Sequence, residues 1–458
     1  MREIFTGGLL GVSYRFWGTT IGMAARQVSA WGRLSREVLP VHTPAFAAEG
    51  ARMLREAPGF VLPHGLGRSY GDVGLNPGGV IQTTGMDRLI AADWETGVVM
   101  AEAGMSLDAL LKVAAPRGWF PPVTPGTRFV TLGGAVANDV HGKNHHGAGT
   151  FGAHIGALGL ARSSGEVTRL TPQDNSELFA ATVGGLGLTG LILWVELRLM
   201  AIGSTDIEME TVALRGLEDF FRVDEESQGW PYTVAWVDCL ATGRRMGRGL
   251  YIRGRHAERG PLAAHGAPKL QVPVEAPAGL LNPLTLSAFN LAYRSRPWAT
   301  GRARTPYEPF FYPLDGIGGW NRLYGPRGFY QFQGAVPRSG APDTVARLLE
   351  TVAEARQGSF LTVLKRFGER ASPGLLSFPL PGVTFALDFP NRGEETLSLV
   401  RRLNDITVAA GGRLYPAKDA AMTPEQFAAS HPGWRGLESH RDPKILSDFW
   451  RRVTGICA

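Results

Sequence analysis

The sequence predicts an α+β protein that contains more than one domain. At 458 residues the chain is too long for one core of ordinary size, so two domains, or three, are expected. A hydrophobic content of 44% with 19% charged residues is typical of a globular protein. The character of the sequence also changes near residue 203, where short glycine-punctuated segments give way to longer strands and amphipathic helices.

The first half alternates short apolar runs with glycine-rich turns. The segment 106–118 predicts a helix, because Ser106 can cap it and the leucines that follow form one apolar stripe. The other elements expected are a strand that enters a glycine turn in 59–72, strands in 79–84 and 97–104, a hairpin over 154–172 that turns at Ser163–Gly165, and a short helix, a glycine turn and a long strand over 175–200.

The second half predicts strands and helices in alternation. Strands are expected at 232–240, 329–337, 360–368 and 383–390, with amphipathic helices at 343–357 and 394–412. The stretch 254–305 is rich in proline, alanine and arginine and is expected to be a mobile excursion over the site.

Charge and cysteine content narrow the function classes. A net charge of +6 and a pI near 9.4 fit either solvated surface arginine or attraction to phosphate, on a cofactor or at an anionic lipid surface. The sequence contains no basic run with interleaved aromatic residues, so it does not predict nucleic-acid binding. Cys239 and Cys457 are too far apart in the sequence to form a metal pattern or a disulfide framework.

The N-terminal residues 1–27 are an uncertain extension, and the ordered domain is expected to begin near Val28. Their apolar stretch is interrupted by Arg15 and Gly18, so it predicts neither a membrane span nor a signal peptide. We therefore expect a cytoplasmic or peripherally membrane-associated protein.

Three glycine-rich segments indicate a large ligand. In "GLGRSYG", Gly65, Gly67 and Gly71 have the spacing GxGxxxG, and the residues that follow cannot open the helix of a Rossmann turn. The segment predicts either a plain tight turn or a nest of free backbone N–H groups able to hold a diphosphate. Similar segments occupy 124–152 and 183–190, and one ligand long enough to touch all three would be a flavin dinucleotide.

The second of these segments contains His141, His145 and His146. A metal site would need these side chains on one helical face, and the surrounding glycines argue against a helix. A histidine cluster that only hydrogen-bonds backbone carbonyls is a second reading. The loop is better interpreted as part of the cofactor cradle, with no metal.

The segments "GLGRSYGD", "PGTRFVTLGGAVANDVHGKNHHGAGTFG" and "ELFAATVGGLGLTG", in this order, resemble the FAD-binding domain of the vanillyl-alcohol-oxidase type of flavoenzyme, the PCMH-type FAD-binding superfamily. The resemblance continues through "LTVLKRFG", "FPLPGVTFALDFP" and "GGRLYPAKDA" and covers nearly everything after residue 28. It implies an FAD-binding domain at 28–203 that is completed by 412–458, with an antiparallel-sheet substrate domain inserted at 204–411. It also implies non-covalent FAD, because many relatives attach the flavin through a histidine in the first glycine turn, where this chain has Tyr70.

The resemblance implies roles for individual residues. Lys418 is the first candidate for catalysis, and His141 and Lys143 are candidates to accept or relay the alcohol proton. The substrate pocket would include Gln331, Gln333, Lys365, Phe367, Trp236, Thr384, Ala386 and Phe311, although Trp236 and Phe367 are equally compatible with core positions. The cofactor would be bound by Gly65, Leu66, Gly67, Arg68, Ser69, Tyr70, Gly126, Thr127, Thr131, Gly133, Gly134, Ala135, Asn138, His141, Gly142, Asn144, Gly187, Gly190 and Tyr415.

Three positions depart from the family pattern. Ala386 stands where the family has a pocket cysteine, Thr384 replaces an asparagine, and Phe311 aligns with a tyrosine. The reaction type survives these changes, but the identity of the sugar does not follow from the sequence.

The function implied is FAD-dependent oxidation of a sugar secondary alcohol, with the 2′-hydroxyl of a polyprenyl-phosphate-linked ribose as the leading substrate. A separate short-chain dehydrogenase would then complete an epimerisation to arabinose, and the lipid substrate implies peripheral contact with a membrane. The alternatives are a soluble aldonolactone or alditol oxidase of the same superfamily, and a non-catalytic flavin-binding partner subunit.

Overall fold

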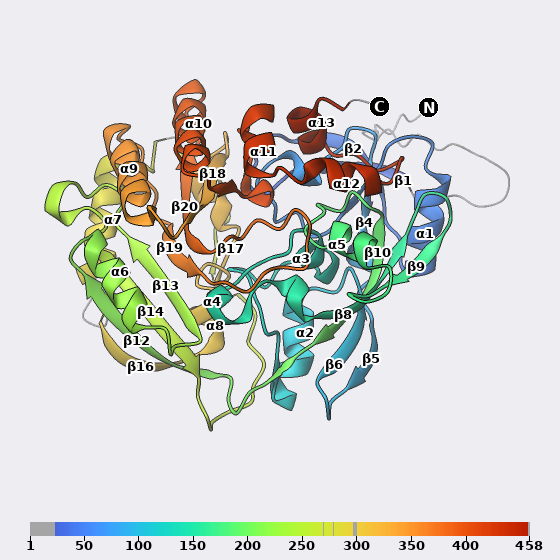
Figure 1. Cartoon of the computed structure of the whole chain (residues 1–458), viewed down its shortest axis with the longest axis horizontal. Helices are drawn as coiled ribbons and strands as arrows, with labels where there is room; N and C mark the ends of the chain where they lie inside the picture. Colours follow the sequence, from blue (N-terminus) through green and yellow to red (C-terminus); the bar gives the residue numbers. More distant parts are fainter. Residues whose placement is uncertain (1–22, 269, 278, 296–299, 457–458) are drawn as a thin grey trace, which may run out of the picture.

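The computed structural model describes residues 23–456, apart from 269, 278 and 296–299. Two groups of elements lie side by side in Figure 1: the N-terminal strands with the C-terminal helices, and a large sheet built from the middle of the chain. This mixture of helices with mainly antiparallel sheets confirms the predicted α+β class.

The N-terminal group contains two sheets. A four-stranded sheet has the order β1-β2-β4-β3, formed by β1 (Met23–Val28), β2 (Glu37–His42), β4 (Val80–Gln82) and β3 (Leu62–His64). A five-stranded antiparallel sheet has the order β5-β6-β10-β8-β9, formed by β5 (Leu89–Asp93), β6 (Val98–Glu102), β10 (Leu191–Arg198), β8 (Ile155–Ala161) and β9 (Val167–Leu170). The predicted hairpin is therefore β8–β9, and the long strand after the third glycine turn is β10.

Short helices connect these strands: α1 (Ala47–Glu56), η1 (Asp72–Gly74), η2 (Thr83–Gly85), α2 (Leu107–Ala114), η3 (Ala115–Arg117), α3 (Leu132–Ala137), α4 (His145–Ala148), η4 (Phe151–His154) and α5 (Ser176–Thr182). The predicted cap of α2 is present, because Ser106 Oγ accepts from Ala109 N at 3.1 Å. A two-stranded pair, β7 (Trp119–Phe120) with β11 (Met200–Ala201), leads into the second group.

Two expectations for this part of the chain are corrected. Residues 1–22 lie outside the described residues, but Met23–Val28 forms an edge strand with β2, so ordered structure begins before Val28. The strand "MAARQV" lacks the alternation that would have marked it. The histidine segment is also partly helical, because His145–Ala148 makes a single helical turn in spite of the glycines around it.

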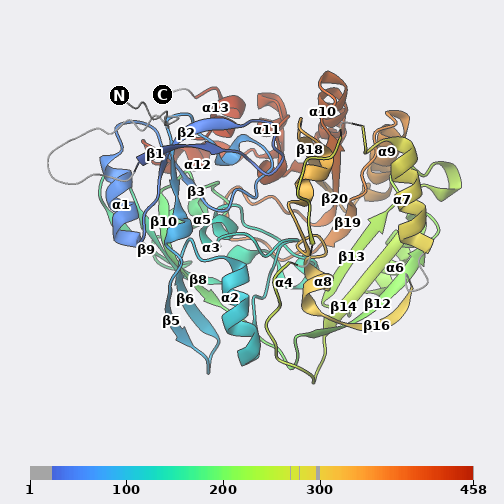
Figure 2. The same ribbon diagram turned by 180° about the vertical axis from the view of Figure 1, so that it is seen from behind.

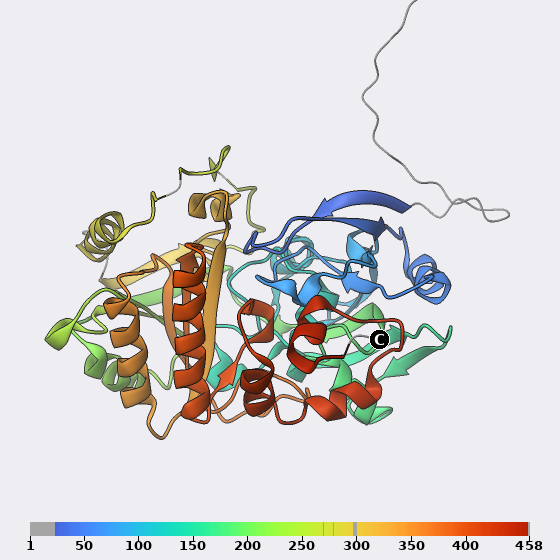
Figure 3. The same cartoon turned by 90° about the horizontal axis from the view of Figure 1, so that it is seen from above.

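The second group is an eight-stranded antiparallel sheet of order β16-β12-β14-β13-β19-β20-β18-β21. Its strands are β16 (Gly301–Pro306), β12 (Asp206–Leu214), β14 (Gly249–His256), β13 (Tyr232–Val237), β19 (Thr362–Phe367), β20 (Gly382–Pro390), β18 (Phe329–Pro337) and β21 (Arg413–Leu414). Helices α6 (Leu217–Glu226), α9 (Ala341–Glu354) and α10 (Glu394–Ala409) cover one face, and the opposite side lies toward the N-terminal group and α7 (Pro283–Ser295) (Figure 3).

The excursion at 254–305 carries more structure than the sequence indicated. Helix α7 lies across the back of the sheet (Figure 2), where its Leu286 is buried and its Asn290 Nδ2 donates to Asp238 Oδ1 at 2.7 Å. The excursion also contains β15 (Leu270–Gln271). Outside it, the second group includes η5 (Gly243–Arg245), α8 (Tyr307–Phe311), β17 (Ile317–Gly318) and η6 (Trp320–Tyr324). Strand β15 pairs in parallel with β17.

The chain returns to the N-terminal group after β21. Helices α11 (Pro424–Ser430), α12 (Trp434–His440) and α13 (Asp448–Thr454) follow η7 (Pro416–Lys418) and lie beside the N-terminal strands (Figure 1). Arg452 on α13 binds Asp72 through two nitrogens at 2.8 Å and also reaches Asp419 at 2.8 Å. Strand β21, which follows residue 412, still pairs with β18 of the large sheet.

Candidate active site

A cavity of about 560 Å³ lies between the two groups of elements. It gathers most of the residues that the sequence singled out, from segments more than 300 positions apart. Predicted residues in its lining are Gly65, Leu66, Gly67, Arg68, Ser69, Tyr70, Gly126, Thr127, Thr131, Gly133, Gly134, Asn138, His141, Gly187, Gly190, Gln331, Gln333, Lys365, Thr384, Ala386, Tyr415 and Lys418.

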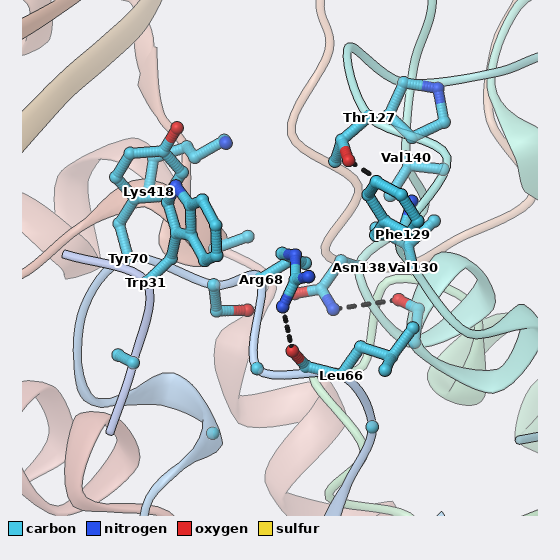
Figure 4. Close-up of a pocket in the computed structure, with 18 of the residues that line it drawn as sticks. Trp31, Leu66, Arg68, Tyr70, Thr127, Phe129, Val130, Asn138, Val140 and Lys418 are labelled. Atoms are coloured by element: carbon cyan, nitrogen blue, oxygen red, sulfur yellow. Dashed lines mark hydrogen bonds between the residues drawn. The ribbon is translucent and has the colours of Figure 1, made fainter. Parts of the chain in front are cut away.

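The first glycine turn offers a run of free backbone donors. Among the described residues, no acceptor is found for the N–H groups of residues 66–69, which follow β3 directly. Gly67 has φ +62°, which a side chain would oppose. Arg68 lies between Leu66 and Asn138 in Figure 4, with its guanidinium carbon 4.4 Å from the ring centroid of Trp31. Of the two readings of this segment, free amides beside a cation favour the nest over the plain tight turn.

The same turn packs directly against the C-terminal segment. A Cβ on Gly71 would lie 1.8 Å from Asp419 O, so no larger residue fits there without backbone movement. Tyr70 N donates to Ala417 O at 2.9 Å. Lys418 Nζ then lies 3.8 Å from the centroid of the Tyr70 ring. The two side chains lie together in Figure 4. Two motifs from opposite ends of the chain thus form one wall.

The other two glycine segments open toward the cavity. A Cβ built on Gly126 or Gly187 would meet no atom within 4 Å, although Gly187 has φ +76°. Thr131 caps α3, since its Oγ1 accepts from Gly134 N at 3.1 Å, and it leaves no room for a side chain on Gly65. These turns keep the backbone close to whatever occupies the cavity.

Strands β18, β19 and β20 form the opposite, polar wall. Gln331 and Gln333 lie two apart on β18 and share a face, as predicted. Gln333 pairs across the sheet with Ala386, and its Nε2 lies 3.3 Å from Thr384 Oγ1 and 3.1 Å from His141 Nε2. The alanine at 386 leaves the cavity without a thiol at this position.

Three buried basic groups line the cavity beside this wall: Lys365 on β19, Lys418 on η7 and His141 from the second glycine segment. Burial and the neighbouring lysines lower the pKa of Lys365 to about 7, and burial lowers the pKa of Lys418 to about 8. Burial, with Lys365, His145 and Lys418 nearby, lowers the pKa of His141 well below its usual value, so its imidazole is neutral at physiological pH. His141 packs among Phe367, Phe378 and Tyr415.

Several predicted site residues lie outside the cavity lining. Lys143 points away from it: Nζ donates to Phe310 O and lies 4.5 Å from the Phe310 ring centroid. Phe311 packs with Phe120 and Tyr232, while Trp236 donates to Phe360 O at 3.0 Å. Phe367, Ala135, Gly142 and Asn144 support the lining from behind, through contacts with His141, the α3 core, Lys365 Nζ and Pro122 O respectively.

The structure also shows polar residues that the sequence did not reveal. Asp388 on β20 is fully buried and accepts hydrogen bonds from Gln331 Nε2 and from Tyr324 OH. The one available signal was a carboxylate inside the apolar strand "VTFALDFP". Trp31 and Asp315 also line the cavity.

The described residues contain neither a candidate metal centre nor a helix that could span a membrane. Within 23–456, less the gaps given above, no three histidine, cysteine or acidic side chains are grouped so that they could hold a metal ion. Over the same residues, every helix is too short or too polar to cross a lipid bilayer.

Comparison with known proteins identifies the family. The model of an FAD-binding domain matches residues 39–171. Decaprenylphosphoryl-β-D-ribose oxidase of Mycolicibacterium smegmatis is 35% identical over 461 aligned residues, which cover 95% of this chain and 99% of that protein. This chain belongs to the decaprenylphosphoryl-β-D-ribose oxidase family. As a member, it is an FAD-linked oxidoreductase that acts on a CH–OH group.

Two further relatives differ in how much of this chain they match. An uncharacterised protein from the mprA 5′ region of Streptomyces coelicolor is 34% identical over 76% of this chain and 100% of its own length. A putative D-arabinono-1,4-lactone oxidase of Neurospora crassa is 28% identical over 31% of this chain and 25% of its own length. The likeness to the lactone oxidase is therefore partial.

The residues of the cavity fit FAD. The free N–H groups at 66–69 match the needs of a diphosphate. Three buried polar atoms on residues lining the cavity have no protein partner, namely Asn138 Oδ1, His141 Nδ1 and Gln331 Oε1. Buried polar atoms are normally hydrogen-bonded, so these are available to a ligand.

Proposed function

We propose that this protein oxidises the 2′-hydroxyl of a polyprenylphosphoryl ribose to the 2′-keto sugar. The observation that carries the proposal is a single cavity in which free backbone amides face buried lysine, histidine and glutamine side chains. The Mycolicibacterium relative is named for an oxidase of decaprenylphosphoryl ribose, and it aligns along nearly the whole of this chain.

The glycine turns would hold the cofactor. When bound, FAD supplies the acceptor for the hydride that leaves the carbinol carbon. The N–H groups at 66–69 and the Arg68 side chain would bind its diphosphate, and the open backbone at Gly126 and Gly187 would admit the rest. The bond to the protein would be non-covalent, because Tyr70 occupies the position in the first turn at which a histidine would be required.

His141 would take the hydroxyl proton. Its imidazole is kept neutral by burial and by the neighbouring lysines, so it has a nitrogen able to accept. Lys418 would remain the cation that stabilises negative charge as it develops in the site, because its pKa of about 8 leaves it largely protonated at neutral pH. Lys143 has no direct part in this scheme, since its ammonium group is directed at Phe310.

The polar wall would recognise the sugar. Gln331 and Gln333 offer amides on one face of β18, and Lys365 offers a third polar group from β19. A site that hydrogen-bonds hydroxyl groups rejects analogues that lack them, since its own polar groups are then left unpaired. We accordingly assign 204–411 to substrate recognition, and 28–203 with 412–458 to FAD.

A lipid-linked substrate also requires access from a membrane. Among the described residues, seven of the twelve large apolar side chains that are exposed belong to one region: Leu262, Leu270, Val274, Leu280, Leu284, Phe289 and Leu291. Gln271, next to Leu270, lines the cavity. This surface supports peripheral membrane contact beside the cavity. A separate short-chain dehydrogenase would reduce the keto sugar and complete the epimerisation.

Anaerobic flavin bleaching tests the proposal. The purified protein should be yellow, release FAD on denaturation, and bleach with a polyprenylphosphoryl ribose. The matched control is the 2′-deoxy analogue of that lipid, which should leave the flavin oxidised. Bleaching by free aldonolactones or polyols alone would indicate a soluble oxidase instead, and a flavin bleached by none of these compounds would contradict the proposed substrate class.

A further inference from the structure

Asp388 lies at the end of the polar wall and has no role in the chemistry described so far. It follows Thr384 and Ala386 on the same face of β20, and it is directly opposite Gln331 on β18. Its side chain is fully buried and does not line the cavity. A buried carboxylate of this kind is costly unless its oxygens accept hydrogen bonds.

The hydrogen bonds of Asp388 determine how Gln331 is oriented. Gln331 Nε2 donates to Asp388 Oδ1, and Tyr324 OH donates to Asp388 Oδ2 at 3.3 Å. An ionised carboxylate can only accept, so it selects the NH₂ end of the glutamine amide. Gln331 Oε1 is then the end left without a protein partner, and Gln331 lines the cavity.

The charge of Asp388 acts on a second cavity residue. Lys365 and Lys418 disfavour each other's charged forms, and both disfavour the charged form of His141. The Asp388 carboxylate opposes this effect, because it raises the pKa of Lys418. Burial raises the pKa of Asp388 itself to about 7, against the hydrogen bond from Gln331 and the charge of Lys418, so the carboxylate is mostly ionised where Lys418 titrates. No ion pair among the described residues joins these two groups, but both act on Tyr70: Lys418 Nζ lies 3.8 Å from the centroid of its ring, and burial and the charge of Asp388 raise the pKa of its hydroxyl.

We propose that Asp388 is a positioning residue of this site: it fixes the Gln331 amide with its carbonyl oxygen toward the cavity, and it supplies the negative charge that balances the Lys418 ammonium. The assignment of Gln331 to sugar binding rests on the proposed function, but the effect on Lys418 does not. A purely structural Asp388 would contribute to folding and leave the proton affinity of Lys418 unchanged.

Competitive acetylation of Lys418 against pH tests the charge effect in the flavin-loaded protein. The acetylated fraction of the peptide that contains Lys418 is measured by mass spectrometry between pH 6 and 10, with a trace of acetic anhydride. The wild-type midpoint should lie near the pKa of about 8. In Asp388→Asn the midpoint should fall by roughly one unit, which raises the free-amine fraction, and so the rate of acetylation, about fivefold at pH 7.

Two further variants keep this test decisive. Asp224→Asn removes a partly buried carboxylate of the same sheet domain, one that accepts from Tyr251 OH at 2.9 Å, and it should leave the Lys418 midpoint unchanged. Tyr324→Phe removes one donor to Asp388 but keeps the stacking on Phe329 at 4.1 Å, and it should shift the midpoint in the same direction by less. If Asp388→Asn does not fold, Tyr324→Phe decides the question. Midpoints equal to that of Asp224→Asn would overturn the charge effect.

The KM for the lipid-linked ribose tests the orientation of Gln331. An asparagine at 388 can face Gln331 with either its oxygen or its NH₂ group, so the Gln331 amide would no longer be held in one orientation. KM should rise about fivefold, the change that corresponds to one misdirected neutral hydrogen bond of about 1 kcal/mol. A KM equal to that of Asp224→Asn would refute this role. Because acetylation does not depend on which sugar is oxidised, failure of the proposed substrate would leave the midpoint result intact.

Discussion

The two walls of the cavity are built on different principles. On the glycine side, ligand contact comes mainly from backbone amides, which need close approach and carry no charge that responds to pH. On the sheet side, contact comes from the side chains of Lys365, Gln331 and Gln333, joined by Lys418 and His141. The proton affinities of the lysines and the histidine depend on one another. The difference indicates that cofactor binding and chemistry can be disrupted separately, although both occur in one cavity.

The largest difference between the effect on catalysis and the effect on flavin binding is expected for Lys418→Met. Removal of the cation should slow anaerobic flavin reduction by about 100- to 1000-fold, the usual cost of losing one electrostatic contact to the transition state. Bound flavin should stay near the wild-type ratio, measured by absorbance after denaturation. The comparison variant is Lys143→Met, whose ammonium group is directed at Phe310 and which should keep the rate within about tenfold of wild type. An equal loss of the flavin reduction rate in Lys418→Met and Lys143→Met would contradict the assignment of catalysis to Lys418.

Gly71→Ala and Gly126→Ala test the glycine side. The methyl group at position 71 would meet Asp419 O at 1.8 Å, so we expect a loss of about 3 kcal/mol in the free energy of unfolding, by urea denaturation. The methyl group at position 126 meets no atom within 4 Å, so stability should change little while the dissociation constant of FAD rises. Equal free energies of unfolding for the two variants would contradict the close approach of Gly71 to Asp419 O.

The pH dependence should differ between the two walls. Lys418 is a cation below its pKa of about 8, so the rate of flavin reduction should fall by about tenfold per pH unit above that value. The cradle amides do not titrate, and the dissociation constant of FAD should stay constant between about pH 6 and 9. Stopped-flow reduction and flavin titration measure the two quantities. A rate that rises with pH would assign Lys418 the role of a neutral base.

The smallest effect is expected for Ala386→Cys. The position lines the cavity and faces Gln333, so a thiol there should react with alkylating reagents that enter the cavity. Flavin reduction should change by no more than a few-fold, because the side chain gains one atom of similar character. Wild-type protein is the control, since its one cysteine in the described residues, Cys239, is buried. A thiol at 386 that stays unreactive would place this residue outside the accessible wall.

The sequence predicted the two walls unequally, because one wall uses backbone amides and the other uses side chains. The glycine side was predictable because each turn is a local pattern, and the free amides at 66–69 are a property of four consecutive residues. The sheet side was only partly predictable. Gln331 and Gln333 follow from strand alternation, but the direction of Lys143 depends on the loop after Gly142, which is pressed against Thr124 O. Asp388 gave no local signal of its partners, since Gln331 and Tyr324 are brought to it by pairing across the sheet.

The contact between Gly71 and Asp419 has a consequence for the order in which the protein matures. The first turn is synthesised early, but the backbone that packs against it comes 348 residues later. A nascent chain therefore carries an incomplete nucleotide site until almost all of it has left the ribosome, and cofactor loading is a post-translational event.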